Sequence, residues 1–165
     1  MKIFIFHYHL KTGGVTAVIR SQIRALRRFC REAAPVVLTG GNPEQAEFDG
    51  ADIQVFPELN YLEEDLPAGE LRSRFDSVKK RLTDTAGKED ILHAHNLCLG
   101  KNPLVTAAVS ELCSTGYRVI NHAHDFAEDR PDRMDLFAKV FSALGLDVTT
   151  TMYPQYMNYG VLNSG

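Results

Sequence analysis

Three short apolar runs in this chain each lead into a pair of histidines separated by one residue. The pairs, which together contain all six histidines, are His7 with His9, His93 with His95, and His122 with His124. If the runs are strands, their period of two places both histidines of a pair on the same face, at the end of the strand. Histidines scattered along a chain do not form such pairs, so the pattern predicts a functional site.

The apolar residues follow two different periodicities along the chain. Apolar-rich segments that predict strands are 3–6, 35–39, 51–56, 91–92 and 117–121, with a weaker sixth at 159–162. The run at 3–6 has no alternation, which is typical of a parallel strand buried on both faces. Apolar residues at helical spacing lie in segments 15–29, 71–82, 103–114 and 136–144. Strands that alternate with helices over the whole length predict an α/β fold, a Rossmann-like, doubly wound, mainly parallel sheet with right-handed crossovers.

The usual strand order of such sheets places the three histidine pairs together. In that order the first strand lies between the second and the fourth, and the fifth lies beyond the fourth. The ends of the first, fourth and fifth strands then adjoin at the switch point, where these folds bind ligands. Because these are the strands that lead into the histidine pairs, we expect the pairs to line one cleft.

A glycine pair, Gly13 and Gly14, separates the first strand from the first helix. A turn at a helix N-terminus presents free backbone N–H groups and the positive end of the helix dipole, and both favour an anion such as a phosphate. The two glycines do not make a complete dinucleotide-binding fingerprint. A turn that only reverses the chain therefore stays open as an alternative.

Composition excludes several classes of protein. The 165 residues suffice for one domain with a proper core, and a net charge of −3 excludes a strongly basic nucleic-acid binder. No apolar run approaches the length of a membrane span. Three cysteines, few and far apart, predict reduced thiols and a cytoplasmic protein.

The first helix carries arginines on the side away from its apolar stripe: Arg20, Arg24, Arg27, Arg28 and Arg31. Such a face is most often solvated. The alternative is peripheral contact with an anionic membrane surface through Arg20, Arg24, Arg27 and Arg31, or attraction of an acidic substrate.

Taken together, these motifs resemble the N-terminal domain of a family 4 retaining glycosyltransferase, whose GT-B fold has two facing Rossmann-like domains. The resemblance covers nearly the whole chain and rests on the order and spacing of short motifs. These are Gly13-Gly14-Val15 with Ile19, Ile23 and Leu26 behind it, Asp90 to His95, Asn96, Gly100-Lys101-Asn102-Pro103, His124-Asp125, and Val161-Leu162-Asn163-Ser164. Residues 1–165 would then be a single Rossmann-like domain that forms one half of a GT-B fold.

The resemblance implies transfer of a sugar from a nucleotide-diphosphate sugar to a carbohydrate or lipid-linked acceptor, with retention of configuration. In this family the N-terminal domain mainly binds the acceptor. The C-terminal domain holds most donor contacts, including a basic pair and paired glutamates that residues 1–165 lack. We therefore expect a chain truncated before its C-terminal donor-binding domain, and inactive by itself.

The resemblance also implies roles for individual residues. The backbone at Gly13 and Gly14 would meet the donor diphosphate, and His124, followed by Asp125, would lie beside the transferred sugar and the attacking hydroxyl. The remaining expected substrate-binding residues are His95, Asn96 and His122. Asp125 is expected to orient the His124 ring, and His122 to lie deeper and more tightly packed. No cofactor is expected, because the nucleotide sugar is a substrate. No catalytic metal is expected either, because this fold class neutralises the leaving diphosphate with backbone N–H groups, the helix dipole and basic side chains.

Two other interpretations of the histidine pairs stay open. Imidazole and carboxylate are zinc ligands, so the pairs with Asp125 also fit a metal-dependent hydrolase. A non-catalytic nucleotide-binding or regulatory domain is the other alternative. Individually, His7, His9, His93 and His122 could serve only in hydrogen bonds within their loops.

Overall fold

The computed structural model describes residues 1–43, 48, 50–63 and 65–161. Within these residues one sheet has the strands β1 (Lys2–His7), β2 (Ala34–Thr39), β3 (Asp52–Val55), β4 (Ile91–His95), β5 (Arg118–Ala123) and β6 (Asn158–Val161). Their order is β3-β2-β1-β4-β5-β6, and every neighbouring pair is parallel. The predicted Rossmann-like, doubly wound sheet is confirmed, as is the place of β1 between β2 and β4.

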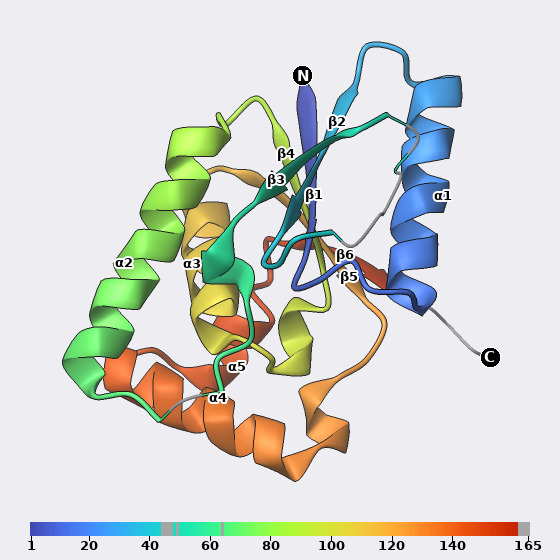
Figure 1. The fold of residues 1–165 in the computed structure, drawn as a ribbon. Helices are drawn as coiled ribbons and strands as arrows, with labels where there is room; N and C mark the ends of the chain where they lie inside the picture. Colours follow the sequence, from blue (N-terminus) through green and yellow to red (C-terminus); the bar gives the residue numbers. More distant parts are fainter. Residues whose placement is uncertain (44–47, 49, 64, 162–165) are drawn as a thin grey trace.

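Helices pack on both faces of this sheet (Figure 1). They are α1 (Gly14–Phe29), α2 (Ala68–Thr85), α3 (Pro103–Ser114), α4 (Pro131–Leu144) and the short α5 (Val148–Met152). Short 3₁₀ turns lie at Pro57–Leu59, Leu97–Leu99 and Ala127–Asp129. Figure 1 shows α1 on one side of the sheet and α2, α3 and α4 on the other.

The apolar residues divide into two cores, one on each face of the sheet. Ile3 and Ile5 of β1 pack with Ile19 and Ile23 of α1. The alternate β1 residues, such as Phe4, belong to the larger core formed with α2, α3 and α4. Because β1 is covered on both faces, its sequence is a continuous apolar run rather than an alternating one.

Helix ends follow local chemistry where the sequence is informative. The Asn102 side chain accepts a hydrogen bond from the Leu104 backbone N–H at 3.1 Å, and Pro103 is the first residue of α3, as predicted. Gly145 ends α4 with φ at 73°, which glycine adopts readily. The start of α4 was predicted too late, at 136, because its first turn, from Pro131, is mostly polar and lacks apolar periodicity.

The predicted ends of the fourth and fifth strands, at residues 92 and 121, were also wrong. β4 continues through His95 and β5 through Ala123. His95 pairs with His122 across the two strands, so the histidines extend the ladder instead of beginning loops. The sixth strand was predicted at 159–162, but Leu162, together with the motif residues Asn163 and Ser164, lies outside the described residues.

The arginine-rich side of α1 is partly covered by the chain after β2. The Arg20 guanidinium lies 5.4 Å from the centroid of the Phe48 ring. An atom of the Arg27 guanidinium lies 3.2 Å from where a side chain at Gly50 would begin. Arg24, Arg27, Arg28 and Arg31 are nevertheless exposed, so most of this face is solvated, as the first interpretation expects.

Two expectations concern the environment of the chain. Cys30, Cys98 and Cys113 are all free thiols, as predicted. A search of the helices in the described part of the chain finds none with the length and apolar character needed to span a membrane.

Candidate functional site

Five of the six histidines lie on the face of the sheet that α1 covers, toward the carboxyl ends of the strands. Ile5, which packs under α1, pairs with His93, so His93 lies on the same face. The period of two then adds His95 on β4, and the register places His122 opposite His95. By the same alternation His7 and His124 lie on this face, so the expected gathering of strand ends brings these side chains together.

The imidazole rings form a stack rather than a scattered group. Ring centroids lie 5.0 Å apart for His93 and His95, 4.9 Å for His95 and His122, and 4.6 Å for His122 and His124. The planes of the last pair are inclined by only 11°. These four histidines form the cluster that we call the histidine stack.

A chain of hydrogen bonds joins the stack to α1 through Gln22. Nδ1 of His95 lies 2.9 Å from Nε2 of His124, and Nε2 of His95 lies 3.0 Å from Oε1 of Gln22. Nε2 of Gln22 lies 3.0 Å from Nδ1 of His122. The amide oxygen can only accept, so Nε2 of His95 donates to it. In a neutral ring Nδ1 of His95 then accepts from Nε2–H of His124, while Gln22 donates to His122.

Burial keeps the inner rings neutral. It lowers the pKa of His95 from 6.5 to about 2, with further lowering by the neighbouring histidines. The pKa values of His93 and His7 fall to about 4, again mainly through burial. Burial lowers the pKa of His122 and His124 as well. At neutral pH these rings therefore act as paired donors and acceptors, not as cations.

His122, on β5, is not more deeply buried than His124, which follows the strand, contrary to the prediction. Both His122 and His124 are half-buried. The reason lies across the strand pair, where His122 is in register with Gly160 of β6. Glycine has no side chain to cover the ring, and a side chain added there would begin 3.7 Å from His122 Cγ.

Asp125 does not orient the His124 ring in the way expected, because the hydrogen-bond partner of that ring is His95. The Asp125 carboxylate is half-exposed and lies 3.5 Å from the Arg130 guanidinium. Its charge raises the pKa of His124, an effect smaller than the lowering by burial and by His122. Asp125 therefore influences His124 through space.

Asn96 is buried and positions the backbone that carries His124. Its Oδ1 accepts from the backbone N–H of His124 at 2.7 Å and of Asp125 at 3.3 Å. Its own N–H donates to the His122 carbonyl at 2.9 Å. Asn96 has φ at 62°, a left-handed conformation that asparagine tolerates better than most residues. The Asn96 side-chain oxygen thus ties the segment after β4 to the segment after β5.

The glycine turn lies at the N-terminus of α1, separated from the end of β1 at His7 by the five residues 8–12. Gly13 and Gly14 are both exposed. A side chain at Gly14 would meet no atom within 4 Å, so the space in front of the helix is open. No hydrogen bond among the described residues joins this turn to the histidine stack. The connection runs along α1, which begins at Gly14 and presents Gln22 to His95 and His122 about two turns later.

Gln22 was missed in the sequence, although a signal for it exists. It lies four residues after Val18, three after Ile19 and four before Leu26, so it falls within the apolar stripe of α1. A lone amide on a sheet-facing stripe needs a hydrogen-bond partner when it is buried. The histidines opposite supply that partner.

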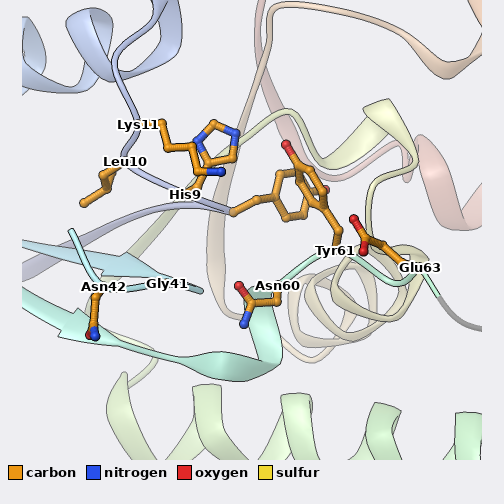
Figure 2. Close-up of a pocket in the computed structure, with 9 residues that line it drawn as sticks. His9, Leu10, Lys11, Gly41, Asn42, Asn60, Tyr61 and Glu63 are labelled. Atoms are coloured by element: carbon orange, nitrogen blue, oxygen red, sulfur yellow. The ribbon is translucent and has the colours of Figure 1, made fainter. Parts of the chain in front are cut away.

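A pocket of about 370 Å³ opens beside the strand ends (Figure 2). Its walls come from the segments after β1, after β2 and before α2: Tyr8, His9, Leu10, Lys11, Gly41, Asn42, Asn60, Tyr61 and Glu63. Figure 2 shows His9 and Lys11 on one side of the Tyr61 ring and Glu63 on the other. The Lys101 ammonium lies 4.8 Å from the centroid of the Tyr61 ring. The pocket combines aromatic surface with both signs of charge.

One nitrogen from each of His93, His95 and His122 lies within 4.8 Å of the other two, close enough for these rings to be considered as metal ligands. The described structure places no carboxylate in this group of three.

Comparison with protein-family models gives no match for the chain. Comparison with curated proteins finds mannosylglucosyl-3-phosphoglycerate synthase of Petrotoga mobilis, with 33% identity over 135 residues. The match covers 76% of this chain and 26% of that protein, so the chain spans about a quarter of the length of this relative. The relative is a glycosyltransferase, and the similarity supports the glycosyltransferase part of the resemblance found in the sequence.

Proposed function

We propose that this domain is the acceptor-side half of a family 4, GT-B type retaining glycosyltransferase. It would move a sugar from a nucleotide-diphosphate sugar to an acceptor in the cleft between this domain and a second, donor-binding domain. The observation that carries the proposal is the hydrogen bond from His124 to the buried His95, which fixes a histidine ring at the carboxyl edge of the sheet. The similarity to a glycosyltransferase supports the glycosyl-transfer part of the proposal.

His124 is proposed as the residue that acts on the reacting sugar. Its Nε2–H donates to His95, so its Nδ1 is left as a hydrogen-bond acceptor. This neutral nitrogen can accept a hydrogen bond from a hydroxyl of the transferred sugar or of the acceptor substrate while positive charge develops on the sugar ring. Asp125, one residue on, would add negative charge near the same place. His95 and His122 would orient His124 and the sugar, and Asn96 would hold the backbone beneath them.

The glycine turn is proposed to meet the leaving diphosphate. The first N–H groups of α1 and the helix dipole favour an anion there, and the open space at Gly14 lets a phosphate approach the backbone. This arrangement, with basic side chains of the second domain, would stabilise the diphosphate without a catalytic metal.

The pocket around Tyr61 is proposed as part of the acceptor site. Sugar rings pack on aromatic faces, and their hydroxyls pair with amides and carboxylates such as those of Asn60 and Glu63. Lys11 and Lys101 lie close enough to attract an anionic group on the acceptor. The name of the relative refers to a phosphoglycerate compound, so a phosphorylated or carboxylated acceptor is the first class to test.

Catalysis is proposed to need both domains. Two substrates must be held in line across the cleft, and correct placement can supply roughly 7–11 kcal/mol of the barrier. A single wall cannot provide this, so residues 1–165 alone are expected to be inactive.

The experiment compares the full-length protein with residues 1–165. Each is incubated with a panel of nucleotide sugars and with neutral and anionic acceptors, and nucleoside diphosphate release and the glycosylated product are measured. We expect product with retained anomeric configuration from the full-length protein alone. No transfer with any donor would contradict the function, and turnover by residues 1–165 would contradict the two-domain arrangement.

A further inference from the structure

Three imidazoles of the histidine stack lie close together on one face of the sheet. His93 and His95 lie two residues apart on the same face of β4, and His122 lies opposite His95 on β5. One ring nitrogen of each lies within 4.8 Å of the others. The backbone of two paired strands therefore fixes all three attachment points on one face.

A second observation points to a missing ligand at the same place. The Nε2 atom of His93 is buried and has no hydrogen-bond partner among the described residues. Buried polar atoms are nearly always paired, and an exception often marks a bound ion or water. The orphan nitrogen belongs to a ring stacked on both other members, with centroids 5.0 Å from His95 and 5.8 Å from His122.

The chemistry of the triad selects the kind of ion. Three imidazoles with no carboxylate suit Zn²⁺ and related transition metals, whereas Mg²⁺ and Ca²⁺ prefer oxygen ligands. Zinc bound by three histidines keeps a fourth position for water. Bonds of about 2.0–2.1 Å place tetrahedral ligand atoms about 3.3–3.4 Å apart, so the rings must turn out of their parallel stack to close on the ion.

Binding of a metal by His95 would replace one of the two hydrogen bonds that its ring makes. Its two nitrogens are held by His124 and by Gln22. When one nitrogen binds a metal, the other can keep its partner, as the outer contacts of metal-bound histidines usually do. The ion and the complete hydrogen-bonded chain therefore exclude one another.

We propose that His93, His95 and His122 form a binding site for Zn²⁺ with one open coordination position. The site goes beyond the proposed glycosyl transfer and does not depend on it, because zinc binding is measured without substrate or activity.

The test is zinc binding to the untagged, chelator-treated 165-residue chain, measured by competition with a chromogenic chelator. Co²⁺ serves as a spectroscopic probe, and Mg²⁺ as a negative control. We expect one zinc per chain and a Co²⁺ spectrum of four-coordinate type. His93→Ala and His122→Ala should each weaken zinc binding by at least about 100-fold, the upper end of the loss seen even for outer-shell changes.

His7→Ala is the matched control, because His7 lies beside His95, with ring centroids 6.5 Å apart, but is outside the triad. It should retain zinc binding. Circular dichroism and thermal unfolding establish that each variant is folded, and two single variants guard against the failure of one. Absence of zinc binding by the wild-type chain, or zinc retained by both triad variants, would overturn the proposal.

Discussion

The Nε2 atom of His124 lies 2.9 Å from Nδ1 of His95, a residue 29 positions earlier in the chain and 2% exposed. His95 is held in turn by Gln22 of α1, which also contacts His122. The half-buried residue that follows β5 is thus tied to a helix on the face of the sheet.

Gln22→Leu removes the hydrogen-bond partner of His95 Nε2 and of His122 Nδ1. Because a buried donor left without a partner destabilises the fold by about 1–3 kcal/mol, we expect the free energy of unfolding to fall by that amount. Ser21→Leu, at an exposed position on the same helix, is the matched control and should change it little. Urea unfolding measures both. An equal effect of the two substitutions would show that Gln22 has no special role.

Asn96→Ala removes the oxygen that accepts from the backbone N–H groups of His124 and Asp125. It also places alanine in a left-handed conformation, so the two effects together should destabilise the domain by about 2–4 kcal/mol. Asn96→Gly separates them, since glycine adopts this conformation freely but has no side-chain acceptor. Chemical unfolding should rank wild type above Asn96→Gly and Asn96→Gly above Asn96→Ala. A glycine variant as stable as wild type would mean that the hydrogen bonds contribute nothing.

Gly14→Ala tests the proposed diphosphate site at the glycine turn without disturbing the fold. Gly14 lies in α1 without positive φ, and an added side chain meets no atom within 4 Å. Stability should stay level or rise by about 0.4–1 kcal/mol, because alanine loses less chain entropy on folding. Binding of a nucleoside diphosphate to the full-length protein, followed by calorimetry, should nevertheless weaken. Unchanged affinity would place the diphosphate elsewhere.

Acid should destabilise the domain earlier than carboxylates alone would explain. The pKa values of His7 and His93 are about 4 and that of His95 about 2, all below the ordinary 6.5. Below pH 6.5 the unfolded chain therefore binds more protons than the folded one. The free energy of unfolding then decreases as the pH is lowered from 6.5 through the pKa values of the folded state. Above pH 6.5 the contribution is fully present. Urea unfolding in the presence of a chelator at pH 7, 6 and 5 measures the free energy of unfolding at each pH. His93→Gln should make this free energy depend less steeply on pH. A flat profile between pH 7 and 5 would contradict the neutral, buried rings.

The sheet and the gathering of histidines could be predicted from the sequence because both follow from local patterns. Apolar runs mark strands, and parallel order brings the ends of β1, β4 and β5 together wherever the loops go. The strand ends at His95 and Ala123 could not be placed, since the ladder there depends on pairing between residues far apart in sequence.

The hydrogen-bond partners of the histidines could not be predicted from local patterns either, because they lie far away in the sequence. Gln22 meets rings 73 and 100 positions away, and nothing next to it in the chain indicates them. The exposure of His122 depends on Gly160, which becomes its neighbour only when β6 pairs with β5. Asp125 follows His124 directly, and that adjacency suggested a contact that the ring instead makes with His95.

The most direct test of the account is the turnover number and donor affinity of His124→Ala in the full-length protein, with His122→Ala measured beside it. His124 is proposed to act on the reacting sugar, while donor binding is proposed to rest mainly on the glycine turn and a second domain. The account predicts that His124→Ala lowers kcat by at least about 10²-fold, the low end for a positioned polar catalytic group, with little change in donor Kd. A near-normal kcat for His124→Ala with a large loss for His122→Ala would assign the role to the other histidine. Near-normal kcat in both variants would show that the histidine stack is not a glycosyl-transfer site.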